Sequence, residues 1–135
     1  MTQEKKIDVA FEEEKPIYVK ADSFYIEQIV TNYFTNAIKH ADEINDKKQI
    51  EIRIEIQKEK ARVYVFNTGN QIAENELDRI WGRFYKIDSS RNRENGGSGI
   101  GLSLVKAIQN NYKNAYGVEN KPDGVEFYFD INLAL

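Results

Sequence analysis

Hydrophobic and polar side chains alternate without a break over residues 49–57, and this alternation constrains the fold more than any other feature of the chain. Ile50, Ile52, Ile54 and Ile56 fall at every second position. A β-strand places all four on one face and the polar residues on the other. A strand with one apolar face needs a second layer to cover that face. We therefore expect a sheet that is covered on one side.

Amphipathic segments elsewhere in the chain can supply this covering layer. Hydrophobic residues recur at intervals of three and four after Asp22, a suitable N-cap, and predict a helix from about Asp22 to Ala41. The same pattern predicts a second long helix from about Gly99 to Tyr112 and a short helix at Glu74–Phe84. We expect these helices to pack on the apolar face of the sheet.

The remaining segments are predicted to be strands and loops. Adjacent strands imply hairpins, so we expect one domain over 1–135 with the α+β fold class, a two-layer sandwich in which a mixed sheet is packed on one face by about three helices. The segment Lys86–Gly97 is polar and without period, and it predicts a long loop that is functional or mobile. The expected strands are Ile7–Phe11, Ile17–Lys20, Gln49–Gln57, Ala61–Asn67, Ala115–Asn120 and Gly124–Leu133.

Composition excludes several classes of function. The formal net charge is −3, which argues against a general basic face for nucleic acid. The chain has no cysteine and one histidine, His40, so disulfides, thiolate zinc sites and multi-histidine metal sites are excluded. No apolar run approaches the ~20 residues that span a bilayer, and the N-terminus does not resemble a signal peptide. We expect a cytoplasmic domain.

Two asparagines stand one turn apart on the first predicted helix. Asn32 and Asn36 share a face, and Lys39 lies next to them. Asparagine is a middling helix former, so two in a helix interior require a reason. Amide oxygens are suitable ligands for Mg²⁺, which usually also binds phosphate oxygens, and a lysine neutralises phosphate charge. A solvated helix face would give the same pattern.

The predicted strand Ala61–Asn67 ends in the sequence Asn-Thr-Gly-Asn. Asn67 can donate to and accept from the edge of a nucleobase. Strand ends beside a helix layer are common positions for ligands. An ordinary turn after a strand would have a similar sequence, so this motif is weak by itself.

A glycine-rich segment, residues 96–102, leads directly into the last predicted helix. Four glycines in this short stretch let backbone N–H groups approach a phosphate, and a helix N-terminus favours its charge. The segment is neither a Walker A loop nor a Rossmann fingerprint. Lys86, Arg91 and Arg93 in the preceding loop suggest a cationic lid, although surface charge for solubility is the alternative. A flexible turn is the alternative for the glycines.

Together these motifs resemble the GHKL ATPase superfamily, which includes histidine kinases, gyrase, Hsp90 and MutL. The resemblance covers nearly the whole chain and implies the Bergerat ATP-binding fold, with ATP and Mg²⁺ as cofactors. In sequence order, the segments that resemble the N, G1, F and G2 boxes of histidine kinases are 22–40, 67–70, 80–85 and 97–102.

The resemblance implies a role for each matching position. Asn36 would ligate the Mg²⁺ that bridges the ATP phosphates, and Asn32 and Lys39 would contact those phosphates, which makes these three the catalytic residues. Asn67 would bind the adenine amine. Residues 86–97 would form the ATP lid. The other implied nucleotide contacts are His40, Gly69, Ile72, Tyr85, Lys86, Arg91, Gly97, Ser98, Gly99, Ile100, Gly101 and Leu102.

Asn32 separates a histidine kinase from a hydrolase of the same superfamily. Gyrase, Hsp90 and the anti-sigma serine kinases have a glutamate there, because water and serine must lose a proton during attack. A neutral imidazole attacks with its lone pair and needs no such base. The resemblance therefore implies transfer of the γ-phosphoryl group of ATP to a histidine, through positioning and charge neutralisation.

Two departures from the histidine kinase pattern matter. Asn67 replaces the usual aspartate of the G1 box and Asn70 its second glycine, a variation that resembles Gram-positive sensor kinases of the vancomycin-resistance type. No phospho-accepting histidine precedes the N box. We therefore expect a soluble, monomeric fragment whose partner is the upstream dimerisation and phosphotransfer domain of a membrane-anchored homodimer, with a response regulator as the indirect partner. A degenerate nucleotide-binding regulatory module and an anti-sigma-type serine kinase are the alternatives.

Overall fold

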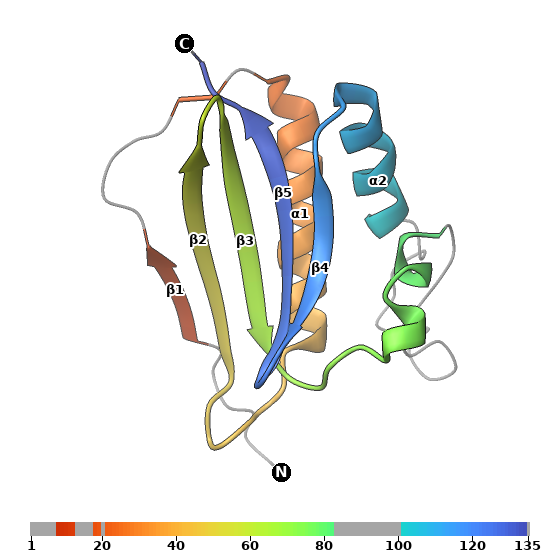
Figure 1. The fold of residues 1–135 in the computed structure, drawn as a ribbon. Coiled ribbons are helices and arrows are strands. Elements are labelled where there is room, and N and C mark those ends of the chain that lie inside the picture. Colours follow the sequence, from red (N-terminus) through yellow and green to blue (C-terminus); the bar gives the residue numbers. More distant parts are fainter. Residues whose placement is uncertain (1–7, 13–17, 20, 83–100, 135) are drawn as a thin grey trace.

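The structure is a computed structural model that describes residues 8–12, 18, 19, 21–82 and 101–134. In this part of the chain, one sheet contains five strands in the order β1-β2-β3-β5-β4 (Figure 1). β1 pairs with β2 in parallel, and the other neighbours are antiparallel, so the sheet is mixed as predicted. The strands are β1 (Asp8–Glu12), β2 (Gln49–Gln57), β3 (Lys60–Thr68), β4 (Tyr116–Lys121) and β5 (Gly124–Asn132).

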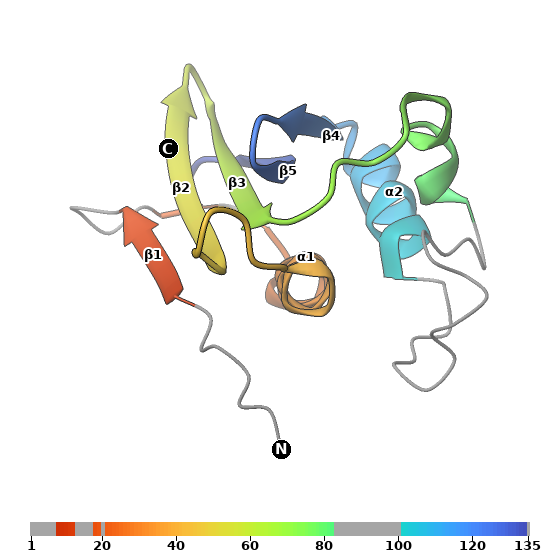
Figure 2. The same ribbon diagram turned by 90° about the horizontal axis from the view of Figure 1, so that it is seen from below.

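Two α-helices, α1 (Ser23–His40) and α2 (Gly101–Tyr112), cover the same face of the sheet (Figure 2). The Asp22 carboxylate caps α1, since Oδ1 accepts from the N–H of Phe24 at 2.9 Å. At the other end, the N–H of Ala41 donates to Ala37 O at 2.8 Å and closes the last turn. The expected two-layer sandwich is confirmed. Neither described helix is long and apolar enough to cross a lipid bilayer.

The hydrophobic core lies between the helices and the covered face of the sheet. Tyr33 is fully buried, and its ring centroid lies 5.3 Å from that of Phe127 and 5.6 Å from that of Phe129. Such aromatic contacts stabilise the core beyond the area that they bury. The buried hydrophobic residues of the two layers include Ile29, Tyr33, Ala37, Ile50, Val65, Val105, Ile108, Val125, Phe127, Phe129 and Ile131.

The alternation along β2 is buried at only one end. Ile50 is fully buried, Ile52 and Ile54 are half-buried, and Ile56 is exposed. β1 ends opposite Arg53, so it does not flank the half of β2 that carries Ile54 and Ile56. The alternation therefore identified the strand correctly but overestimated the area that the strand buries.

The structure corrects the pairing of the N-terminal segments. β1 pairs in parallel with β2, and α1 crosses between these two strands, where we expected a hairpin between Ile7–Phe11 and Ile17–Lys20. Of the second segment, Val19 forms an isolated bridge with Leu133 at the other end of the chain. Residues 7, 17 and 20 lie outside the described part.

The predicted short helix at Glu74–Phe84 is also corrected. Two 3₁₀ helices, η1 (Glu74–Glu76) and η2 (Arg79–Trp81), occupy its described part. A short α-helix is marginal by itself, and here the burial of Ile80 and Trp81 decides the conformation. Phe84, the loop Lys86–Gly97 and the first residues of the last predicted helix lie outside the described part.

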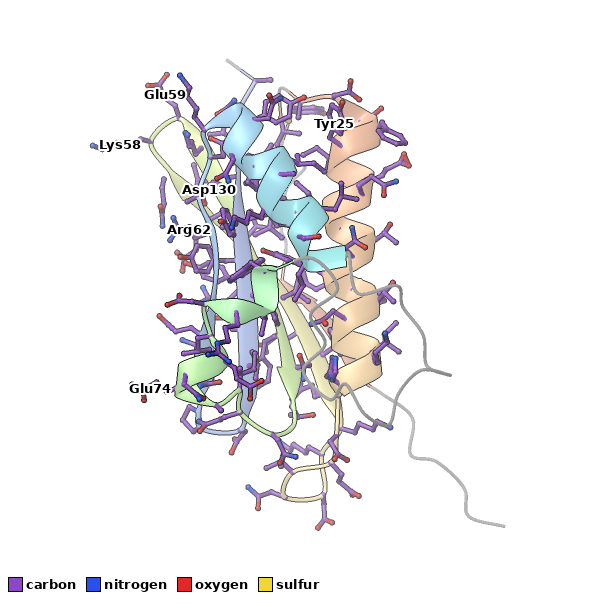
Figure 3. The ribbon with its side chains drawn as sticks, turned by 90° about the vertical axis from the view of Figure 1, so that its right-hand side faces the viewer. Tyr25, Lys58, Glu59, Arg62, Glu74 and Asp130 are labelled. Atoms are coloured by element: carbon purple, nitrogen blue, oxygen red, sulfur yellow. The ribbon has the colours of Figure 1, made fainter. Side chains whose placement is uncertain are left out.

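In the described part of the chain, the opposite face of the sheet carries ion pairs and no second helix layer. Arg62 donates from Nε and Nη2 to the two carboxylate oxygens of Asp130 at 2.7 and 3.1 Å (Figure 3). These hydrogen bonds to Asp130 raise the pKa of Arg62. The Arg62 guanidinium also lies 4.5 Å from the centroid of the Tyr128 ring. The charged groups of Arg62 and Asp130 on this face are therefore paired with each other across neighbouring strands.

Tyr33 joins α1 to the sheet by a hydrogen bond as well as by packing. Its hydroxyl donates to the carbonyl oxygen of Tyr128 at 2.9 Å. Burial raises the pKa of Tyr33 well above its ordinary value, so the phenol stays neutral and keeps its proton for this bond.

Replacing Tyr33 with phenylalanine removes the hydrogen bond and keeps the ring. We expect Tyr33→Phe to lower the free energy of unfolding by about 1 kcal/mol, the net contribution of one such bond. Urea unfolding followed by circular dichroism measures this difference. Tyr18→Phe, at a residue that is 74% exposed, is the control and should change little. Equal losses in both variants would contradict the role of the Tyr33 bond.

Candidate functional site

The predicted site residues that the structure describes lie along the second half of α1, at and after the end of β3, and in the first described turn of α2. α1 and β3 end side by side at one end of the sandwich, and α2 begins nearby (Figure 1). Figure 3 shows Glu74 at this end and the Lys58–Glu59 turn at the opposite end. Two close approaches define the site, one between Gly101 and Asn32 and one between Gly69 and the end of α1.

The polar stripe of α1 lies at the border of the core. Ile29, Tyr33 and Ala37 are buried against the sheet, and this orientation leaves Asn32 and Asn36 half-buried beside them. Lys39 is exposed at the end of the stripe, and His40 is half-buried in the last turn. The packing of the apolar face therefore determines where the amides stand.

Asn32 has a buried polar atom that a ligand could satisfy. Its Nδ2 atom is buried, and among the described residues it has no hydrogen-bond partner. A buried donor without an acceptor costs roughly 1–3 kcal/mol. A ligand with an acceptor oxygen at this position would remove that cost.

The start of α2 lies directly against the same amide. A Cβ atom at Gly101 would stand 3.1 Å from Asn32 Oδ1, so glycine permits the close approach of the two helices. The neighbouring Leu102 is half-buried and packs against the core. The amide of Asn32 and Gly101, the first described residue of α2, thus lie together, and we call this place the polar corner.

Asn67 lies at the end of β3 in a fixed orientation. It is 3% exposed, and its Nδ2 donates to the carbonyl oxygen of Thr68 at 3.0 Å. The same carbonyl oxygen accepts from the N–H of Asp42 at 2.8 Å, which joins the end of β3 to the segment after α1. Because Nδ2 points to Thr68, Oδ1 is the atom of this amide that remains for a ligand.

Gly69 permits the close contact between this turn and α1. Its φ of +145° lies in the region that favours glycine, and a Cβ there would stand 2.8 Å from His40 O. The N–H of Gly69 donates to Asp123 O at 3.0 Å in the turn between β4 and β5. The turn after β3 therefore contacts both the end of α1 and the turn between β4 and β5.

Ile72 continues the loop after Gly69 into the core. It is 5% exposed, and its backbone N–H and C=O are both bound by the side chain of Asn120 on β4. Sequence reasoning missed Asn120, because a single polar residue on a strand gives no signal of what its side chain binds.

The structure leaves part of the predicted site untested. No group of three or more histidine or acidic residues able to hold a metal exists in the described part of the chain. The predicted contacts that lie outside the described residues are Tyr85, Lys86, Arg91, Gly97, Ser98, Gly99 and Ile100.

Comparison with known sequences supports a nucleotide site. The family model of the histidine kinase-, DNA gyrase B- and HSP90-like ATPases matches residues 21–135. The sensor histidine kinase YkoH of Bacillus subtilis is 34% identical over 85% of this chain and 24% of its own length. The sensor protein VanSB of Enterococcus faecalis is 34% identical over 84% of this chain and 25% of its own length. The chain thus spans about a quarter of these relatives.

Solved structures show the same fold. The nucleotide-free catalytic domain of the histidine kinase ThkA has a TM-score of 0.77 and 31% identity, with 94% of this chain and 78% of that chain covered. Full-length ShkA in complex with AMPPNP has a TM-score of 0.76 and 26% identity, with coverage of 95% and 26%. ThkA in complex with the response regulator TrrA has a TM-score of 0.71 and 29% identity, with coverage of 95% and 34%.

The conformation of Gly69 leads to a stability prediction. We expect Gly69→Ala to lower the free energy of unfolding by about 1–3 kcal/mol, because the new methyl group meets His40 O and the backbone conformation is strained. Gly82→Ala is the matched control, since its φ is −77° and its Cβ would approach only Arg79 O, at 3.3 Å. Thermal unfolding of the two variants measures the difference. Equal melting temperatures would contradict the proposed contact.

Proposed function

The chain belongs to the family of histidine kinase-, DNA gyrase B- and HSP90-like ATPases, and on this premise we propose that it is the catalytic domain of a sensor histidine kinase. It binds ATP at the end of the sandwich and transfers the γ-phosphoryl group to a histidine outside this chain. The observation that carries the proposal is the buried Nδ2 of Asn32, which has no hydrogen-bond partner among the described residues and lies beside Gly101 of α2.

The phosphates bind at the polar corner between α1 and α2. Asn32 Nδ2 donates to a phosphate oxygen beside Gly101, the first described residue of α2. Lys39 is exposed and brings a mobile positive charge to the same stripe of α1. Residues 86–97, which the resemblance implies to be the ATP lid, lie outside the described part of the chain.

Asn36 is the residue that would hold Mg²⁺. It lies one turn from Asn32, half-buried, and presents an amide oxygen of the kind that Mg²⁺ accepts beside phosphate oxygens. When bound, the ion neutralises charge on the phosphates during transfer.

The adenine binds beside the end of β3. Asn67 Oδ1 accepts from the exocyclic amine of the base, while Nδ2 remains bound to Thr68 O. Gly69 and Ile72 form the loop beside the base. A neutral amide gives a weaker hydrogen bond than a carboxylate, and it also costs less to desolvate.

The acceptor of the phosphoryl group is a histidine. Water and serine need a general base, and an amide at Asn32 cannot take a proton. An imidazole nitrogen attacks with its own lone pair, so positioning and charge neutralisation are sufficient. This reasoning disfavours both a hydrolase and a serine kinase.

The acceptor histidine lies on a separate dimerisation domain of the parent protein. The sensor kinases that resemble this chain are about four times its matched length, which leaves room for such a domain and for a sensor. We propose that the parent is a membrane-anchored homodimer with the present domain in the cytoplasm. A response regulator then receives the phosphoryl group from that histidine.

Two assays test the proposal. Calorimetry should detect binding of ATP and ADP by the chain. Without a partner domain, the chain should hydrolyse ATP at a negligible rate. Addition of the parent's histidine-containing domain with radiolabelled ATP should produce a phosphoprotein that is labile to acid. No nucleotide binding at millimolar concentrations would overturn the proposal.

Asn36→Ala should reduce the part of the ATP affinity that depends on Mg²⁺. We expect ATP affinity in Mg²⁺ to fall at least about tenfold, a change of about 1.4 kcal/mol, because the cation loses its protein ligand. Affinity for ADP in EDTA should change much less. Thr35→Ala, at an exposed neighbouring position, is the control. A loss of the same size with and without Mg²⁺ would contradict the role of Asn36.

Asn67→Asp tests whether asparagine at this position binds the nucleotide as well as aspartate would. A carboxylate oxygen in place of Nδ2 would face the Thr68 carbonyl oxygen, so we expect no gain in ATP affinity and a free energy of unfolding that is lower by roughly 1–3 kcal/mol. Asn70→Asp makes the same charge change at an exposed position and serves as the control. A large gain in affinity for Asn67→Asp alone would instead indicate a decayed pocket.

A further inference from the structure

The loop after Gly69 runs antiparallel to the end of the β4–β5 hairpin, and it is bonded to that hairpin at three successive points. The N–H of Gly69 donates to Asp123 O at 3.0 Å. Gln71 Nε2 donates to Lys121 O at 2.7 Å. The backbone of Ile72 is bound by Asn120. The bonded residues follow one antiparallel register, as they would between two antiparallel strands.

Asn120 makes the two bonds that a strand backbone would make. Its Oδ1 accepts from the N–H of Ile72 at 2.9 Å, and its Nδ2 donates to Ile72 O at 2.8 Å. One amide side chain therefore satisfies both backbone groups of a residue that is 5% exposed. We name this pair of hydrogen bonds the Asn120 clasp.

The clasp acts at the edge of the sheet. β4 is the last strand in the sheet order, so its outer edge has no further strand to pair with in the described fold. The loop follows the hairpin round to this edge, as Figure 1 shows where the chain passes from β3 beneath β4. The loop after Gly69 is thus held to the β4–β5 hairpin at the end of the sandwich where the candidate site lies.

We propose that Asn120 is a positioning residue of the nucleotide site, which holds Ile72 in place as one wall of the adenine pocket. This inference rests on the proposed function, because it takes Ile72 to face the bound base. Asn120 touches no ligand itself. It acts through Ile72, whose side chain is buried while its backbone is fixed by the clasp.

The position of the clasp explains why its effect should be confined to the base. Ile72 follows Gly69 in the loop, and a Cβ at Gly69 would lie 3.5 Å from Asn67 Nδ2, the amide proposed to bind adenine. The polar corner proposed for the phosphates is formed by other segments, α1 and the start of α2. Loosening Ile72 should therefore weaken base binding and leave the contribution of Mg²⁺ unchanged.

Asn120→Ala tests the proposal in the full 135-residue chain. We expect the Kd for ATP and the Kd for ADP to rise by the same factor, about tenfold, both with Mg²⁺ and in EDTA. Amide exchange at the Ile72 N–H should accelerate, because its acceptor is lost. Asn120→Asp keeps an acceptor for the N–H and places an oxygen against Ile72 O. It should also weaken binding, which gives a second test if the alanine variant folds poorly.

Asn114→Ala is the matched control. Asn114 precedes β4, is buried, and accepts from Lys60 Nζ at the far end of the sheet. Its loss should lower the melting temperature without changing either Kd. Wild-type Kd values in both Asn120 variants would overturn the inference, as would a rise in Kd that Asn114→Ala reproduces. Absence of nucleotide binding by the wild-type chain would instead overturn the proposed function.

Discussion

The burial of one face of α1 against the sheet is the constraint on which the site depends. Ile29, Tyr33 and Ala37 must face Phe127, Phe129 and their neighbours, and this requirement fixes the rotation of the helix about its axis. With that rotation set, Asn32 and Asn36 stand at the border of the core rather than in open solvent. The hydroxyl of Tyr33 adds a directional bond to Tyr128 O, which fixes the height of the helix along the sheet as well.

Backbone carbonyl groups then organise the other half of the site. Thr68 O receives the N–H of Asp42 and the amide of Asn67, so the end of a strand, the exit from a helix and a side chain converge on one atom. Such a shared acceptor determines the direction of the amide without any charged partner. The substitution of asparagine for the usual aspartate is therefore accommodated by the local geometry.

The architecture and the polar stripe could be predicted from sequence because they rest on local periodicity. The positions of α1 and of β2 through β5 followed from spacing and alternation, and their ends fell within about a residue or two of the prediction. The parallel pairing of β1 did not follow, because partner choice depends on contacts between distant segments. The 3₁₀ helices also differed from expectation, since the burial of Ile80 and Trp81 outweighs intrinsic helix preference there. The role of Asn120 could not be predicted either, because its partner, Ile72, lies far away in sequence.

The buried amide nitrogen of Asn32, which has no hydrogen-bond partner among the described residues, links the proposed site to the stability of the fold. An apolar residue of similar size at this position would leave no donor unsatisfied, so we expect it to stabilise the ligand-free fold. Selection for stability alone would remove the asparagine. Under the proposed function, a substitution that stabilises the ligand-free fold at this position would weaken nucleotide binding.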